Sequence, residues 1–198
     1  MLSKQGSFVD VAVGEARVYA ADEVTDCRSA YGNALRDLAA ENDNVVALTA
    51  DVAGSVKTNI LGKEFPDRHI ECGIAEQDMV SQAGGMALKG LLPVVHSFAC
   101  FLSTRPNEQI YNNATEKKKI IYVGSLAGLL PGGPGHSHQS VRDISALGGI
   151  PGLTLIEPSC EAEVAQVVDY AVNQNEFSTY IRLVSIPYSV PFELPDNY

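Results

Sequence analysis

The pattern of hydrophobic and polar positions changes repeatedly between two kinds of segment from residue 28 to residue 187. Short apolar runs, typical of strands buried on both faces, alternate with segments whose apolar residues recur at helical spacing. The predicted strands cover 44–50, 91–98, 119–125, 152–158 and 179–187, and the predicted helices cover 29–42, 73–90, 106–119, 140–149 and 161–174. This alternation predicts an α/β fold of three layers, α/β/α, with a mostly parallel, doubly wound sheet.

The two ends of the chain lack this pattern. Residues 1–25 show no clear period and are expected to form an extended N-terminal arm. Residues 26–187 are expected to form one domain, and the proline-containing segment 188–198 is expected to be an extended tail. Ser29 is the expected N-cap of the first helix.

Composition limits the class of protein. The chain has 198 residues, of which 45% are hydrophobic and 19% charged, so it can bury a core and is not mainly disordered. The net charge of −10 argues against nucleic acid or an anionic membrane as the main partner. The sequence has no apolar run that approaches the roughly 20 residues needed to span a membrane. Its N-terminus also lacks the apolar core of a secretory signal. The four cysteines are widely spaced, which is typical of reduced thiols. Together with the missing membrane span and secretory signal, this spacing predicts a cytoplasmic protein.

The carboxylate of Glu76 is the first candidate for chemistry. On a helical wheel it shares a face with Val80 and Ala83. A carboxylate among small apolar residues is costly without a hydrogen-bonding partner, and such a group suits proton transfer. Interaction with the helix dipole explains the residue equally well. The nearby stretch 83–85, Ala-Gly-Gly, allows another backbone to approach closely, at an interface or in tight packing.

Two further segments contain aromatic and histidine side chains. Phe98 and Phe101 are three positions apart and share a face of a helical turn, which suits either an aromatic platform for a planar ring or a pair of core residues. His136 and His138 lie in a loop rich in glycine and proline. Two histidines lack the third ligand that a zinc site needs, so acid–base work or substrate binding is favoured over metal binding.

Two charged residues lie at predicted strand ends. Asp51 directly follows a strand, where a ligand contact and a helix cap are both reasonable. Arg182, in the last strand, needs an anionic partner if it is buried.

Several long segments together resemble the pyrimidine-binding module of the transketolase family of thiamine-diphosphate-dependent enzymes. The resemblance covers about residues 26–187. It rests on the segments LTADVAGS, FPDRHIECGIAEQDMVSQAGGMALKG, PVVHSFACFLSTRPNEQI, GHSHQSVRDISALGGIPGLTLIEP and YIRL. It implies the thiamine-diphosphate-binding fold of that module.

The resemblance implies a role for each candidate residue. Glu76 matches the catalytic glutamate that bonds N1′ of the cofactor's aminopyrimidine and promotes its imino tautomer, and His138 matches a catalytic histidine near the substrate. The residues expected to bind the cofactor are Phe98, Phe101, Asp51 and Ile74, with Phe101 as the stacking ring. Arg182 matches an arginine that binds substrate phosphate, and His136 is expected to bind substrate as well. None of these residues is expected to bind metal.

The resemblance also implies a partner. The family binds diphosphate and a divalent metal through a GDG…N motif on a different module, and full transketolases carry a further C-terminal domain. This sequence contains no GDG and ends where that domain would begin. We therefore expect one subunit of a split enzyme, in an α2β2 assembly whose other chain holds most of the Mg²⁺ contacts. Such an enzyme transfers a two-carbon ketol or acyl unit from a keto donor to an aldehyde or keto acceptor. The stretch 83–85 would then pack at a helix interface.

Two positions depart from transketolases that act on sugars. Their loop reads Asp-Gly-Pro-Thr-His-Gln, whereas residues 134–139 here read Pro-Gly-His-Ser-His-Gln. Pro134 replaces the aspartate, and Leu126 replaces a histidine further upstream. Each change removes a polar partner for a sugar hydroxyl, worth about 1–3 kcal/mol. We therefore expect a less hydroxylated donor, such as a 2-oxo acid or a small acyloin. Two alternatives stay open: a β-type subunit of a 2-oxo acid decarboxylase or dehydrogenase, and a non-catalytic partner with the same fold.

Overall fold

A parallel sheet of six strands forms the centre of the protein in the computed structural model, which describes residues 24–189. The strand order is β3-β2-β4-β5-β7-β6, and all neighbouring strands are parallel. The strands are β2 (Val45–Thr49), β3 (His69–Glu71), β4 (Leu92–Phe98), β5 (Ile121–Ser125), β6 (Thr154–Ile156) and β7 (Thr179–Arg182). Inner strands β2 and β5 are buried along their whole length, because helices cover both of their faces.

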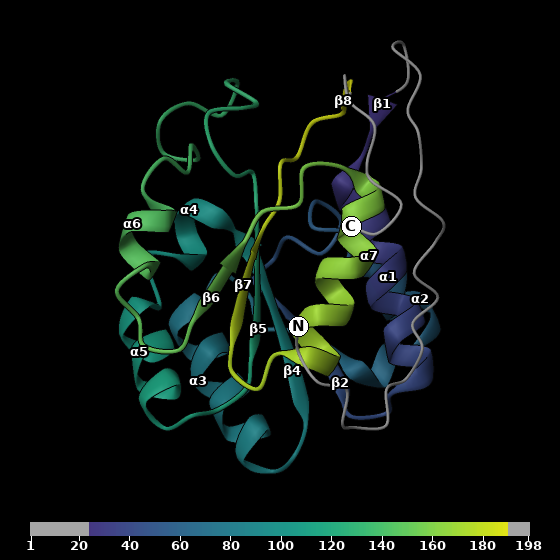
Figure 1. Cartoon of the computed structure of the whole chain (residues 1–198), viewed down its shortest axis with the longest axis vertical. Coiled ribbons are helices and arrows are strands. Elements are labelled where there is room, and N and C mark those ends of the chain that lie inside the picture. Colours follow the sequence, from purple (N-terminus) through teal and green to yellow (C-terminus); the bar gives the residue numbers. More distant parts are fainter. Residues whose placement is uncertain (1–23, 190–198) are drawn as a thin grey trace, which may run out of the picture.

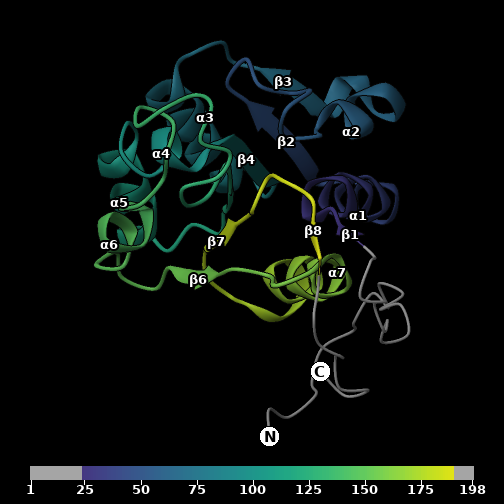
Figure 2. The same cartoon turned by 90° about the horizontal axis from the view of Figure 1, so that it is seen from above.

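Helices form a layer on each face of the sheet (Figures 1 and 2). One layer contains α1 (Cys27–Glu41), α2 (Asn59–Glu64) and α7 (Glu161–Asp169). The other contains α3 (Glu76–Leu88), α4 (Ala99–Leu102), α5 (Asn107–Thr115) and α6 (Asp143–Leu147). A 3-10 turn (Pro66–Arg68) precedes β3, and a π-helical turn (Tyr170–Gln174) follows α7. The predicted three-layer α/β/α fold is confirmed.

The first helix begins two residues before the predicted cap. Asp26, and not Ser29, is the N-cap of α1, so that prediction was wrong. Asp26 Oδ1 accepts hydrogen bonds from the backbone N–H groups of Arg28 and Ser29, and Ser29 Oγ donates to Asp26 Oδ2. A carboxylate can both accept from the free N–H groups and interact with the helix dipole, which explains why it occupies the cap.

Strand β3 and helix α2 were not predicted. Strand β3 has three residues at the edge of the sheet, and only Ile70 among them is apolar. Helix α2 has six residues and buries only Leu61. Both elements are too short to show a period in the sequence.

The first and last described residues pair with each other. β1 (Val24–Thr25) and β8 (Tyr188–Ser189) form a separate antiparallel ladder. The rest of the predicted arm and tail lies outside the described residues, and the division at residues 25 and 187 stays a prediction. No disulfide joins the cysteines, all of which lie in the described segment. None of the helices described is long and apolar enough to cross a membrane.

Candidate functional site

The candidate residues lie in segments that follow the carboxyl ends of the strands. Glu76 is the first residue of α3, after β3. Phe98 ends β4, and Phe101 lies in α4 directly after it. His138 belongs to the loop that follows β5. Because the strands are parallel, these segments meet at one edge of the sheet, where ligands of such folds bind.

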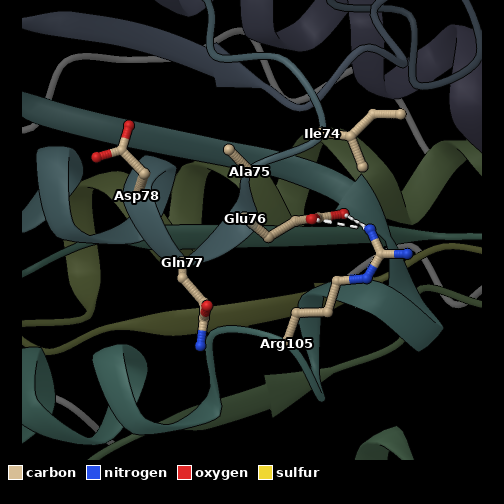
Figure 3. Close-up of a pocket in the computed structure, with 6 residues that line it drawn as sticks. All are labelled: Ile74, Ala75, Glu76, Gln77, Asp78 and Arg105. Atoms are coloured by element: carbon tan, nitrogen blue, oxygen red, sulfur yellow. Dashed lines mark hydrogen bonds and ion pairs between the residues drawn. The ribbon is translucent and has the colours of Figure 1, made fainter.

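The Glu76 carboxylate is buried, with 2% of its side chain exposed. Arg105 Nη1 donates to Oε1 at 2.7 Å and to Oε2 at 2.9 Å (Figure 3). Ser97 Oγ donates to Oε1 at 3.1 Å. Val80 and Ala83 on the same helix face are fully buried. The buried charge is thus stabilised by a guanidinium, a hydroxyl and the N-terminus of α3. Both sequence interpretations of Glu76 therefore describe part of its environment.

A cluster of three rings, Phe98, Phe101 and His138, contacts the arginine of this ion pair through Phe101. The ring centroids of Phe98 and Phe101 are 6.0 Å apart, and the His138 ring meets the Phe101 ring edge-on at 5.1 Å. Arg105 Cζ lies 3.8 Å from the Phe101 centroid, in a cation–π contact. Both phenylalanines are only partly buried. Their role as an aromatic platform for a planar ring stays a prediction.

A cavity of about 480 Å³ lies beside Glu76. This volume is within the range of pockets for small molecules and cofactors. The cavity is lined by Ile74, Ala75, Glu76, Gln77, Asp78 and Arg105 (Figure 3). Ile74 has 73% of its surface exposed, an unusual value for an isoleucine beside a cavity. The cofactor-binding role expected for Ile74 stays a prediction.

Asp51 and His136 are both exposed in strand-end loops. The backbone N–H of Asp51 donates to Glu71 Oε1 at 2.6 Å, and its φ of 58° is in the left-handed region. Asp51 does not cap α2, whose N-cap is Thr58, so that alternative is wrong. The ligand-binding roles expected for Asp51 and His136 stay predictions.

Arg182 has the anionic partners that its burial requires, and they come from this chain. Its Nε donates to Asp143 Oδ2 at 2.8 Å, its Nη1 donates to Glu157 Oε1 at 2.6 Å, and its Nη2 donates to the Ser140 carbonyl at 3.2 Å. Burial alone would lower the pKa of Arg182, but its contacts with the two carboxylates raise it. All three nitrogens of the guanidinium have partners, and the expected role in phosphate binding stays a prediction.

Arg105 is the site residue that the sequence analysis missed. The available signal was its spacing, because Arg105 follows Phe101 by four positions and so lies on the same side of a helical turn.

Two thiols, Cys72 and Cys100, lie near Glu76 and Phe101 in the sequence. Burial raises the pKa of both Cys72 and Cys100, so neither is a thiolate at neutral pH. Within residues 24–189, no cluster of three or more His, Cys, Asp or Glu side chains could hold a metal ion.

Comparison with known families and proteins gives consistent matches. The family described as transketolase, pyrimidine binding domain, matches residues 23–186. The chain is 38% identical over 157 residues to a putative transketolase C-terminal section from Methanocaldococcus jannaschii, covering 79% of this chain and 49% of that protein. It is 34% identical over 145 residues to 1-deoxy-D-xylulose-5-phosphate synthase from Clostridium kluyveri, covering 73% of this chain and 23% of the synthase. The chain therefore spans between about a quarter and a half of the length of these relatives.

Solved structures match the fold. A split-gene transketolase, described as an inactive β4 tetramer, has a TM-score of 0.74 and 30% identity, covering 89% of this chain and 56% of that one. The transketolase from Leishmania mexicana has a TM-score of 0.79 and 22% identity, covering 88% of this chain and 27% of that one. At that identity the second match supports the fold alone.

Proposed function

The chain belongs to the transketolase family through its pyrimidine-binding domain, and from this premise we propose that it supplies the pyrimidine-binding half of a thiamine diphosphate site. The enzyme so formed transfers a two-carbon ketol or acyl unit. The observation that carries this proposal is the buried Glu76 carboxylate, which lines a cavity of about 480 Å³ next to partly exposed aromatic rings.

The residues present fit an aminopyrimidine ring. A planar heterocycle needs a flat apolar contact and a polar group that bonds its ring nitrogen. Phe98 and Phe101 offer the first and Glu76 the second, and the cavity is large enough for such a ring. Bound thiamine diphosphate supplies the nucleophilic carbon that attacks the carbonyl of the donor.

Each residue then has a separate task. Glu76 bonds the ring nitrogen and holds the proton between that nitrogen and its own carboxylate oxygen. Phe101 stacks on the ring, while Ile74 and Asp51 complete the cofactor contacts. His138 Nδ1 lies 3.0 Å from Ser137 Oγ, which leaves Nε2 for proton exchange with substrate. His136 contacts substrate in the same loop.

The diphosphate and Mg²⁺ require groups from another module. We propose that a second chain carries them and that the two chains assemble as α2β2 in the cytoplasm. Two similarities support this arrangement: one relative is named as a C-terminal section of transketolase, and one solved structure comes from a split-gene transketolase. The Arg182 guanidinium, with its internal partners, contributes to substrate binding only if one of these contacts opens.

The donor is expected to carry few hydroxyl groups. Pro134 is exposed in the loop after β5, and Leu126 has a φ of 57° with its N–H donating to Ser185 Oγ at 2.6 Å. Neither side chain can hydrogen-bond a sugar hydroxyl. A 2-oxo acid or small acyloin therefore suits the site better than a ketose phosphate, and a 2-oxo acid decarboxylase is the second candidate. Steady turnover of xylulose 5-phosphate by the reconstituted pair would contradict this substrate class.

The test begins with the full chain, tagged and recovered from its native host. Recovery of a stoichiometric partner with bound thiamine diphosphate and Mg²⁺ supports the proposal. In the reconstituted complex, Glu76→Gln should lower activity at least 100-fold, since general acid–base groups typically contribute that much. Glu108→Gln, an exposed acidic residue in the first turn of α5, is the matched control and should leave activity unchanged. Full activity of Glu76→Gln would mean that the chain is a scaffold.

A further inference from the structure

The Glu76 carboxylate pairs with the charged side chain of Arg105, which has no role in the function proposed above. Arg105 lies on the turn between α4 and α5, and 39% of its side chain is exposed. One of its nitrogens, Nη1, contacts both oxygens of the carboxylate. Cζ of the same guanidinium lies over the Phe101 ring, 3.8 Å from its centroid. Arg105 therefore contacts both the buried acid and the Phe101 ring.

The ion pair leaves room for a further hydrogen bond to Glu76. Oε1 accepts from both Ser97 and Arg105, whereas Oε2 accepts only from Arg105 among the contacts within the described residues. Each carboxylate oxygen has two acceptor positions. Oε2 can therefore accept from an N–H group of a ring in the cavity while Arg105 stays in place.

The polar groups that contact this carboxylate all donate hydrogen bonds to it. Arg105 contributes a positive charge, Ser97 donates a hydroxyl hydrogen, and the N-terminus of α3 contributes its dipole. A buried carboxylate with such partners is a hydrogen-bond acceptor. The group that binds it from the cavity must then be a donor.

We propose that Arg105 is a positioning residue that holds the Glu76 carboxylate as a hydrogen-bond acceptor beside the cavity, so that the ring nitrogen in contact with Glu76 must donate to it. This inference rests on the proposed function. The role needs an arginine, because a planar guanidinium can stack on Phe101 and contact both carboxylate oxygens at once. Lysine would keep the charge but lose the stacking contact, so Arg105→Lys should restore only part of the effect.

The ion pair can be tested in the full chain without cofactor. With ¹³C-labelled glutamate, the resonance of the Glu76 carboxyl is identified by its loss in Glu76→Gln. It should move in Arg105→Gln at a fixed pH and stay in place in Arg36→Gln. Arg36 is the matched control because it pairs with the exposed Asp37 on α1, outside the site. An unchanged Glu76 resonance in both Arg105→Gln and Arg105→Lys would overturn the proposal.

The functional consequence is measured in the assembled complex with thiamine diphosphate and Mg²⁺. The readouts are the affinity for thiamine diphosphate by calorimetry and the rate of hydrogen–deuterium exchange at its C2 position, neither of which needs a donor substrate. Arg105→Gln should slow exchange about 10- to 100-fold, the effect of losing a hydrogen bond to a charged group. Arg105→Lys should fall between it and the wild type, and Arg36→Gln should match the wild type.

The two proposals fail in different ways. A wild-type complex that neither binds thiamine diphosphate nor accelerates C2 exchange would overturn the proposed function. A wild-type complex that does both, together with an Arg105→Gln complex of equal affinity and exchange rate, would overturn only the role of Arg105.

Discussion

Arg182 Nε donates to Asp143 Oδ2 across 2.8 Å, and this contact ties the end of β7 to the first turn of α6. The Tyr180 hydroxyl donates to the same oxygen at 3.0 Å. The Asp143 side chain is 1% exposed and the Arg182 side chain 13% exposed, so water screens this pair little. The pair lies beside the loop that carries His138, and its loss should disturb that loop as well as the core.

Asp143→Asn tests the contribution of this pair to stability. The substitution keeps the shape of the side chain but removes the more buried of the two negative charges that pair with the guanidinium. Breaking one side of a buried pair typically costs 3–5 kcal/mol, and the remaining contact with Glu157 places the expected loss at about 3 kcal/mol. Urea denaturation of the full chain measures it. Asp37→Asn, in an exposed pair with Arg36, should cost no more than about 1 kcal/mol. Equal losses in both variants would contradict the assigned burial.

Gly84 and Gly85 should respond oppositely to alanine. A Cβ on Gly84 would overlap the Asn113 side chain of α5, whose Nδ2 donates to the Val80 carbonyl. No heavy atom lies within 4 Å of the corresponding position on Gly85. Gly84→Ala should therefore destabilise the chain by about 1–3 kcal/mol, whereas Gly85→Ala should stabilise it by about 0.5–1 kcal/mol through helix propensity. Thermal unfolding of the isolated chain measures both. If Gly85→Ala also weakened association with the proposed partner chain, this helix face would lie at the interface.

A buried histidine should make stability depend on pH. His96 Nδ1 donates to the Leu48 carbonyl at 3.1 Å, and its Nε2 accepts from the Tyr31 hydroxyl at 2.6 Å. Both nitrogens are satisfied when the ring is neutral. Burial, with a smaller effect of His69, lowers the pKa of His96 from 6.5 to about 3. The folded state therefore binds fewer protons than the unfolded state between these two values.

It follows that stability is lost as the pH falls. The contribution of His96 is fully present above pH 6.5 and declines by about 1.4 kcal/mol per pH unit until about pH 3. Between pH 7 and pH 5, the wild type should lose about 2 kcal/mol more than His96→Gln. Denaturant unfolding at the two pH values gives this difference even if the variant is less stable overall. Equal losses would show that another group carries the pH dependence.

Burial determined which elements the sequence could predict. Inner strands such as β2 and β5 read as apolar runs because neighbours cover both faces, and long helices such as α1 and α3 show a full period. The edge strand β3 has one apolar residue and gives no such signal. The sequence therefore predicts a strand or a helix where that element buries many residues.

Candidate site residues could be recognised in the sequence where a single residue violates a pattern. Glu76 is an acid on an apolar helix face, and its partner Arg105 contacts Phe101, whose ring meets His138. Arg105 follows Phe101 by four positions, but an arginine on a turn is ordinarily solvated, so this spacing alone did not single it out. The partner of Arg182 is 39 positions away in the sequence, so local pattern could not identify it. Long-range ion pairs were the part that required the structure.

Ser97 should have a smaller effect on the site than Glu76. Its hydroxyl, fully buried on β4, donates to Glu76 Oε1 at 3.1 Å, and Arg105 remains when that bond is lost. Ser97→Ala should therefore cost about 1 kcal/mol, or roughly fivefold in the C2 exchange rate of the reconstituted complex. Ser81→Ala, which removes an exposed hydroxyl bonded to the Gln77 carbonyl on α3, is the control. Because Ser97 and Arg105 bind one carboxylate, the double variant should depart from additivity by at least about 0.5 kcal/mol. Strict additivity would mean that the two donors act on the site independently of Glu76.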